Sequence, residues 1–293
     1  MPVGGYFAGI EDMIIIRIQG GLGNQLFQYA LYEMFRQKGI KTKVDISDYV
    51  DGREKRAYEL AKLGLNPEVA DRKELHRYYA DNSRLTDRVF RYWFGRKKYR
   101  KEKRYDFNPQ ILTMTDGFLS GYWQSEKYFA DVSCKVRDRI CFQSIDTEEV
   151  RRWEKQMDKN NSVSVHVRLG DYRQTEELYG NICTASYYRQ AIQYIAMRIE
   201  NPIFYVFSDE PEQAAGMLKD YQCYVIAENR GEDSYKDMYL MSRCRHHIIA
   251  NSTFSWWGAW LDNKMDKIVV SPSKWNHLCK SQDICCEGWA VLS

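Results

Sequence analysis

The sequence predicts an α/β fold. Six short apolar runs typical of strands alternate with segments of helical periodicity, which is the order found in folds built on parallel sheets. The six runs lie at residues 14–18, 163–167, 203–207, 225–226, 247–250 and 268–270. The chain has 293 residues, of which 44% are hydrophobic, so it can bury one large core or two of ordinary size without disulfides.

The spacing of these runs divides the chain into two α/β halves. Helical patterns dominate between residues 45 and 155, whereas a regular rhythm of strands and helices begins after the polar turn at 159–161. We therefore predict an N-terminal domain over 13–158 and a C-terminal domain over 159–293. Residues 1–12 precede the first strand and are interpreted as an N-terminal extension.

Helix boundaries are clearest in the second half. Thr184 can cap a helix over residues 185–200, Pro202 ends it, and Pro211 can begin the next helix. The apolar stripe of the first of these helices repeats every three or four residues and consists of Tyr188, Ile192, Ile195 and Ile199.

Charge and cysteine content restrict the class of protein. The formal net charge of +3 is small for this length, so no strong overall field indicates nucleic acid or a membrane as the partner. The eight cysteines form no CxxC pair and no Cys/His metal-binding spacing, and residues 1–12 contain no signal peptide. We expect a reduced, cytoplasmic protein with buried thiols.

The most informative segment is the strand at 163–167 and the residues that follow it. Val163, Val165 and Val167 alternate with polar residues, which predicts one buried face with a period of two. His166 and Arg168 then share the other face near the carboxyl end of the strand. Ligands bind at this edge in open α/β sheets.

Arg168 has the side chain best suited to a phosphate in this segment. Its guanidinium group is planar and permanently charged, and Gly170 allows the backbone to turn sharply before Asp171. A strand that ends in a turn with a surface ion pair would account for the same residues. The segment alone does not separate these two interpretations.

Two other strands also end in polar residues. Asp209 follows the strand at 203–207, where it could contact a ligand or cap the next helix. Asn251, Ser252 and Thr253 follow the strand at 247–250. Either hydroxyl residue can cap the helix that starts there, which leaves backbone N–H groups and the positive end of the helix dipole available to an anion. We interpret the aromatic residues behind them as core.

The first strand leads into a glycine-rich turn. Gly21 and Gly23 let backbone amides approach a phosphate closely, and Asn24 and Gln25 add neutral donors. Leu26 stands where a dinucleotide-binding fingerprint would have glycine, and no lysine follows as in a P-loop, so nicotinamide and ATP cofactors fit poorly. Together, the four strand ends predict a site for a phosphate and a polyol.

These segments together resemble the α-1,2-fucosyltransferases, a family of inverting enzymes that transfer L-fucose from GDP-fucose to galactose. The resemblance extends from residue 13 to about residue 272 and is carried by four blocks in order, at 20–29, 166–172, 207–210 and 251–261. One position departs from the family pattern. Leu169 stands where a second arginine is common, so Arg168 must contact the phosphate without that neighbour.

The resemblance implies a GT-B architecture, in which two Rossmann-like domains face each other across a cleft. The C-terminal domain would bind GDP-fucose and the N-terminal domain would lie on the acceptor side. By similarity, His166 and Asp209 would help to place the guanine, and Arg168 would bind the diphosphate with hydroxyl and amide groups. The donor-binding set implied in this way is Gly21, Gly23, Asn24, Gln25, His166, Arg168, Asp209, Asn251, Ser252 and Thr253.

The family forms an α linkage from a β-linked donor, which implies one displacement with inversion. Because the chain has no DxD motif to hold a metal, we expect Arg168 and helix amides to stabilise the leaving diphosphate, with no metal and no other cofactor. Asp171 is the candidate general base, although it could instead orient Arg168 or cap a turn. A base from the N-terminal domain, or a dissociative path that needs little base assistance, would also fit.

The family implies a galactose-terminated glycan as acceptor, in surface glycan or O-antigen synthesis. This glycan could be linked to a lipid. Loops within residues 45–155 are expected to select the rest of the acceptor. Two other functions fit the same residues. One is a sugar-nucleotide or glycan-binding protein without activity, and the other is a transferase for another linkage or GDP-sugar. The oligomeric state is not predicted.

One segment, from Arg91 to Tyr105, is rich in both basic and aromatic residues. It could bind RNA, or it could contact an anionic membrane, which would place the enzyme at the inner face of the membrane and suit a lipid-linked acceptor. We favour a third interpretation, a solvated helix and loop with the aromatic rings turned inward. No nucleic acid partner is expected.

Overall fold

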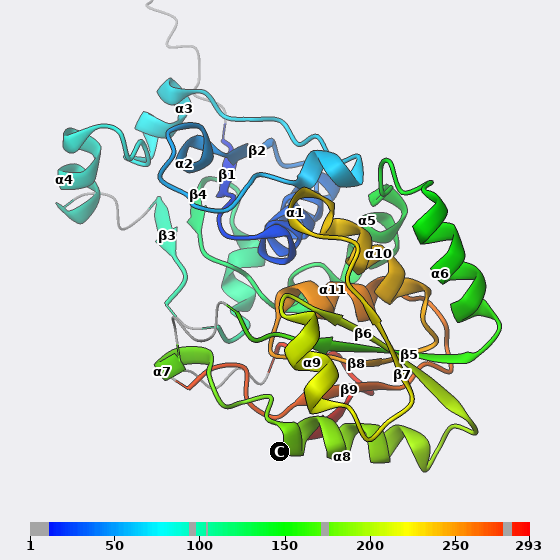
Figure 1. Ribbon diagram of the computed structural model, residues 1–293. Coiled ribbons are helices and arrows are strands. Elements are labelled where there is room, and N and C mark those ends of the chain that lie inside the picture. Colours follow the sequence, from blue (N-terminus) through cyan, green and yellow to red (C-terminus); the bar gives the residue numbers. More distant parts are fainter. Residues whose placement is uncertain (1–11, 94–97, 104, 171–175, 278–282) are drawn as a thin grey trace, which may run out of the picture.

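The computed structural model describes residues 12–93, 98–103, 105–170, 176–277 and 283–293. In the described chain, two separate sheets form, and their strands pair in parallel (Figure 1). The first sheet consists of β1 (Ile14–Arg17), β2 (Thr42–Asp45), β3 (Tyr99–Lys101) and β4 (Gly117–Ser120), in the order β2-β1-β4-β3. The second consists of β5 (Asn161–Val167), β6 (Pro202–Ser208), β7 (Cys223–Ile226), β8 (His246–Ile248), β9 (Val269–Pro272) and β10 (Ala290–Leu292), in the order β10-β9-β8-β5-β6-β7.

The predicted α/β class is confirmed, and each of the six predicted strands is present within a few residues of its expected bounds. Strands β2, β3, β4 and β10 are missing from the prediction. Length alone does not explain this, since β1, β7, β8 and β9 are equally short and were predicted, but β2 and β3 are mostly polar and form no apolar run. The expectation that β5 buries only one face is wrong. Ser164 and His166 are as buried as the valines, because helices cover both faces of a parallel sheet.

The helices of the described chain are α1 (Leu22–Gln37), α2 (Ser47–Val50), α3 (Arg72–Arg77), α4 (Leu85–Trp93), α5 (Ser133–Arg139), α6 (Glu148–Asp158), α7 (Glu176–Tyr179), α8 (Ala185–Ala196), α9 (Pro211–Met217), α10 (Tyr235–Arg243) and α11 (Thr253–Leu261). Thr184 caps α8 as predicted, because its Oγ1 accepts a hydrogen bond of 3.4 Å from the backbone N–H of Tyr187. The helix ends at Ala196, somewhat before the expected residue 200. Helix α9 begins at Pro211, as predicted.

Helices α1 and α11 join the two sheets through one hydrophobic core, and they lie side by side between the sheets in Figure 1. The ring of Phe27 in α1 lies 4.5 Å from that of Trp256 and 5.1 Å from that of Trp257 in α11, measured between centroids. Aromatic side chains bury more area than any others and dominate the stability of such contacts. The interpretation of this aromatic cluster as core is confirmed.

Helix α6 lies just before the predicted domain boundary but packs with the second sheet. The ring of Trp153 lies 6.2 Å from those of Tyr205 in β6 and Tyr224 in β7. The division into residues 13–158 and 159–293 stays a prediction.

The basic and aromatic segment is divided between α4 and β3, with residues 94–97 and 104 outside the described chain. Tyr99 turns inward and stacks on Phe118, with 5.0 Å between ring centroids. Tyr92, in contrast, is 70% exposed. The interpretation with inward-facing rings therefore holds for Tyr99 and fails for Tyr92. Within the described ranges, no helix is long and apolar enough to cross a membrane.

Candidate active site

A cavity of about 670 Å³ lies between the carboxyl ends of the two sheets. The first sheet contributes residues 20–24, which follow β1. The second contributes Arg168 after β5, Asp209 after β6 and residues 251–254 after β8. Segments that are far apart in the sequence thus meet at the edge where open α/β sheets bind ligands.

Two helix N-termini meet at this cavity, because α1 and α11 touch at their first turns. A Cβ atom on Gly23 would lie 2.5 Å from the carbonyl carbon of Thr253 and 2.7 Å from the backbone nitrogen of Phe254, so only glycine fits. Ser252 caps α11, and its Oγ accepts from the N–H of Phe254 at 3.3 Å. Both helix dipoles therefore favour an anion at the same place.

Arg168 and Asp209 form an ion pair at the cavity wall, with Nε and Oδ2 3.2 Å apart. The Asp209 carboxylate also accepts from the backbone N–H groups of Leu169 and Gly170, each at 3.0 Å. Asp209 thus fixes both the turn after β5 and the guanidinium group. It does not cap α9, because the N-cap position of that helix is Glu210. The ion pair is present, and the ligand contact of Arg168 stays a prediction.

His166 lines the cavity from the end of β5 and is buried. Burial, together with the positive charge of Arg168, lowers the pKa of His166 to about 3, so the ring is neutral at working pH. Its Nδ1 has no hydrogen-bond partner among the described residues, and its ring lies 5.9 Å from that of Phe254. A buried polar atom without a partner beside a cavity is suited to a hydrogen bond with a ligand.

Two amide residues of the predicted set also line the cavity, but they have structural partners. Asn251 donates to the backbone carbonyls of Tyr179 at 3.3 Å and Trp275 at 3.2 Å. Asn24 accepts from the side chain of Gln124 at 2.8 Å, which links the turn after β1 to the segment after β4. Both residues therefore stabilise the cavity wall and also line the cavity.

One residue of the predicted donor-binding set, Gln25, does not line the cavity of the described structure. Gln25 is fully buried, donates to the carbonyls of Gly20 at 2.9 Å and Ala57 at 2.7 Å, and accepts from the N–H of Glu59 at 2.8 Å. Its amide stabilises the glycine-rich turn, because both polar atoms of the side chain form hydrogen bonds with backbone groups. The candidate base Asp171 lies outside the described residues.

Asp237 of α10 lines the cavity and was not predicted. Burial raises its pKa to about 8, although its Oδ1 accepts a hydrogen bond of 2.7 Å from the Asn229 amide. The residue lies inside a helix rather than at a strand end, so the strand-end pattern could not find it.

A comparison with protein families decides the class of this site. The model of glycosyl transferase family 11 matches residues 6–293, which is nearly the whole chain.

The chain belongs to glycosyl transferase family 11.

This family is the α-1,2-fucosyltransferase family that the four sequence blocks resemble, and the chain is therefore a glycosyltransferase with a GT-B-like fold. An α-1,2-colitosyltransferase of Escherichia coli is 32% identical over 96% of this chain and 99% of its own length. The O-antigen biosynthesis glycosyltransferase WbnK of Escherichia coli is 33% identical over 94% of this chain and 99% of its own length. Among solved structures, NodZ α-1,6-fucosyltransferase soaked with GDP-fucose is 16% identical, with a TM-score of 0.47 over 86% of this chain and 92% of that chain.

This glycosyltransferase has a second cavity, of about 540 Å³, beside the first. Tyr105 lines both cavities. The neighbouring residues Gln19 and Gly20 are divided between them, with Gln19 at the second cavity and Gly20 at the first. Glu102, which follows β3, and residues 121–122, which follow β4, form another part of its wall. This cavity was not predicted, because β3 and β4 form no apolar run that marks a strand in the sequence.

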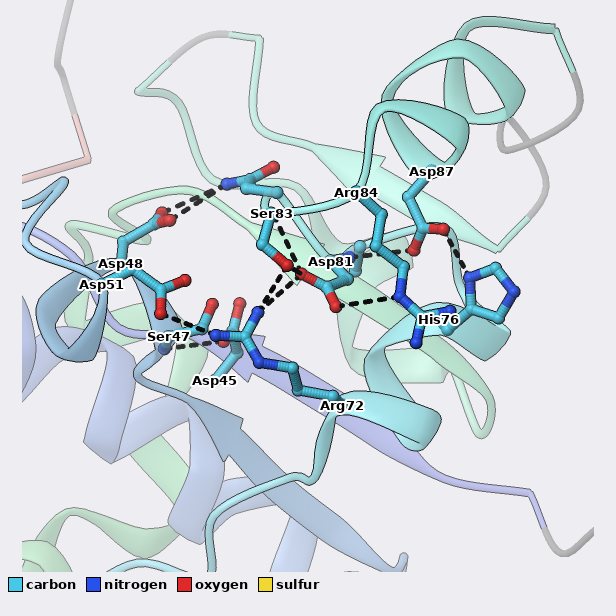
Figure 2. Close-up of polar contacts among 12 residues, drawn as sticks. Asp45, Ser47, Asp48, Asp51, Arg72, His76, Asp81, Ser83, Arg84 and Asp87 are labelled. Atoms are coloured by element: carbon cyan, nitrogen blue, oxygen red, sulfur yellow. Dashed lines mark hydrogen bonds and ion pairs between the residues drawn. The ribbon is translucent and has the colours of Figure 1, made fainter.

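A polar network fixes the wall of the second cavity from outside (Figure 2). Arg72 donates to Asp51 at 2.6 Å and to the fully buried Asp81 at 2.9 Å. Asn82 lines the cavity and donates to Asp48 at 3.1 Å. Since a buried carboxylate that loses its partner is strongly destabilising, this network holds the cavity wall in one position.

Proposed function

We propose that this glycosyltransferase is a galactoside α-1,2-fucosyltransferase, which transfers L-fucose from GDP-fucose to the 2-hydroxyl of a terminal galactose with inversion. The observation that carries the proposal is the pair of helix N-termini that meets Arg168 at one cavity, within a chain of this family. Surface glycan or O-antigen synthesis is the proposed setting, because WbnK is similar over almost its whole length.

In this proposal the diphosphate of GDP-fucose lies at the first turns of α1 and α11. Backbone N–H groups of residues 21–23 and 252–253 donate to its oxygens, and the Arg168 guanidinium group adds a charged, two-pronged donor. His166 and Asp237 also line this cavity, and we propose that they contact the guanine. Asp209 holds Arg168 in place rather than competing for the ligand.

The reaction is a single displacement at C1 of fucose. Negative charge develops on the leaving diphosphate, and the Arg168 guanidinium group together with the two sets of helix amides stabilises it as the bond breaks. These donors are fixed before the substrate arrives, so little reorganisation is needed. The proposal includes no metal, because the protein supplies the positive charge itself.

A second donor is favoured by one specific observation, which is the similarity to an α-1,2-colitosyltransferase over 96% of the chain. The residues proposed to contact guanine and diphosphate do not recognise the sugar. GDP-colitose is therefore the alternative donor for the same site and the same linkage.

The decisive experiment is a transfer assay with radiolabelled GDP-fucose, with GDP-colitose in parallel, on galactosides of several linkages. An α-1,2 linkage in the product, established by NMR, supports the proposal. Transfer from GDP-colitose alone would replace the donor, and a different linkage would overturn the assignment. A preparation treated with EDTA should keep its activity, whereas activity lost with EDTA and restored by Mg²⁺ or Mn²⁺ would refute the metal-free mechanism.

The proposal places the enzyme in the cytoplasm at the inner face of the membrane, where a lipid-linked acceptor would be reached. Helix α4 supports this, because Leu85 and Tyr92 are 71% and 70% exposed beside several arginines. Cosedimentation with vesicles of phosphatidylglycerol should occur at low salt and weaken as salt is added. No cosedimentation at low salt would remove the membrane contact from the proposal.

A further inference from the structure

Glu102 lines the second cavity, which shares Tyr105 with the first, and the mechanism above does not use it. It follows β3 at the carboxyl end of the first sheet and lines the second cavity. The segment after β4 passes from one cavity to the other, because Tyr122 lines the second and Gln124 lines the first. The Glu102 carboxylate is bound to the middle of that segment.

The backbone around Glu102 holds this carboxylate in one position. Its Oε2 accepts from the N–H of Tyr122 at 2.6 Å, and the N–H of Trp123 is shared between Oε1 at 3.2 Å and Oε2 at 3.3 Å. A Cβ atom on Gly121 would lie 2.4 Å from the Cβ of Glu102, so the absence of a side chain there permits the contact. Trp123 has a φ of 54°, and strain of this kind is typical of functional sites.

The second cavity offers a surface for a sugar beside this carboxylate. The rings of Tyr105 and Tyr122 are stacked, with 6.3 Å between centroids and 6° between planes. Tyr105 lines both cavities, so a sugar that lies against this pair is next to the donor cavity. Pockets of this kind bind their ligands through an apolar wall and a few placed polar groups.

The charge state of Glu102 suits proton transfer near neutral pH. Burial raises its pKa to about 7, while the two backbone N–H groups act in the opposite direction. A base whose pKa lies near the working pH is the most effective. The titratable and charged groups that line the same cavity are Arg17 of β1, Arg91 of α4, Tyr99 and Lys101 of β3, Lys103 and Tyr105 after β3, and Tyr122 after β4.

We propose that Glu102 is the general base of the transfer and that the second cavity holds the acceptor; this rests on the proposed function. The acceptor hydroxyl gives its proton to a carboxylate oxygen of Glu102. The oxygen of the acceptor hydroxyl forms the bond to C1 of fucose as the bond between C1 and the phosphate oxygen breaks. The electron pair of the broken bond leaves with GDP. Glu102 then releases the proton to water. This role is the one first predicted for Asp171.

The test is Glu102→Gln, because the Gln Oε1 can still accept from both backbone N–H groups. We expect kcat for transfer to fall at least 100-fold, with the affinity for GDP and the melting temperature unchanged. The kcat/KM of the wild type should fall below about pH 7, and this acid limb should be absent from the variant. Glu68→Gln, an exposed residue paired with Lys43, is the matched control and should retain full activity.

Hydrolysis of GDP-fucose, in which water takes the place of the acceptor, separates this proposal from the proposed function. Glu102→Gln should lower hydrolysis as well as transfer, so the role of Glu102 is measured even if galactosides prove to be the wrong acceptors. Retention of most of the wild-type kcat in both reactions would overturn the proposal. If kcat falls together with GDP affinity and melting temperature, Glu102 has a structural role, and this result would also overturn the proposal. If Asp171→Asn abolishes turnover while Glu102→Gln does not, the base is Asp171.

Discussion

Arg168 is the single residue on which leaving-group stabilisation depends most in the proposed mechanism. Arg168→Ala should lower kcat by 10²-fold to 10³-fold or more, because it removes a fixed charged donor from the transition state. Arg168→Lys should be intermediate, since lysine keeps the charge but loses the planar fork. Steady-state kinetics and circular dichroism are the measurements. Arg198→Ala, at an arginine that stacks on Tyr194, is the control, and turnover of Arg168→Ala near the wild-type rate would remove the role.

Asp237 is expected to bind the guanine as a carboxylate, because two adjacent N–H donors of that base favour the charged form and so oppose the burial that raises its pKa to about 8. Asp237→Asn keeps the shape of the side chain and should weaken GDP binding by about tenfold or more, given ~1.5–3 kcal/mol for a hydrogen bond to a charged group. Isothermal titration calorimetry with GDP measures this. Unchanged GDP affinity in a folded variant would show that Asp237 does not contact the base.

The residues found from the sequence differ from those missed in one physical respect. Arg168, Asp209 and Ser252 follow apolar or alternating runs that mark a strand in the sequence, and the carboxyl ends of parallel strands meet at one edge of a sheet. Asp237 lies in a helix and Glu102 follows a mostly polar strand, so neither has a local pattern that marks its position. Gln25 was included because of its neighbours, but its side chain points to the backbone rather than to the cavity.

The contact between α1 and α11 gives a prediction about how helices build the site. In the interior of a helix, glycine to alanine normally stabilises by about 0.5–1 kcal/mol. At Gly23 the added methyl group would meet backbone atoms of Thr253 and Phe254, which cannot move alone, so the two helices must separate. Gly23→Ala should therefore destabilise the protein by about 1–3 kcal/mol and weaken GDP binding.

Gly216→Ala in α9 is the matched control, because a Cβ atom there would meet nothing within 4 Å. This variant should be slightly more stable than the wild type and bind GDP normally. Thermal unfolding and GDP titration of both variants make the comparison. Equal stabilisation by the two substitutions would contradict the close contact between the helices.

Elements could be predicted where their pattern is long enough to recognise. The strands β5 and β6, with seven residues each, and the capped helix α8 were found close to their bounds. The first sheet was mostly missed, since β2 and β3 are mostly polar and β4 begins with glycine and ends with serine, so none of them forms a recognisable apolar run. The second cavity is lined by residues of β3 and β4 and by residues that follow them, so it was not expected either.

The stability of the whole molecule depends on histidines that are buried in a neutral form. His247 is fully buried in β8, between the hydroxyl of Ser164 at 2.8 Å and the carboxylate of Asp262 at 3.0 Å. Burial lowers its pKa to about 4, although Asp262 acts in the opposite direction. The pKa of His166 is lowered to about 3, again mainly by burial. In the unfolded chain both imidazoles titrate near pH 6.5.

Between pH 6.5 and pH 4 the unfolded chain therefore binds more protons than the folded protein does, so stability falls as the pH is lowered through this window. For His247 the loss amounts to about 3 kcal/mol at pH 4, which is a large part of the stability of an ordinary domain. Urea unfolding without GDP, followed by tryptophan fluorescence at pH 7, 6, 5 and 4.5, should show this loss. In His247→Gln the titrating group is absent, so the slope of stability against pH near pH 5 should be lower by about 1 kcal/mol per pH unit, whatever the stability at pH 7. Parallel curves for the two proteins would mean that His247 does not hold its neutral form in the folded state.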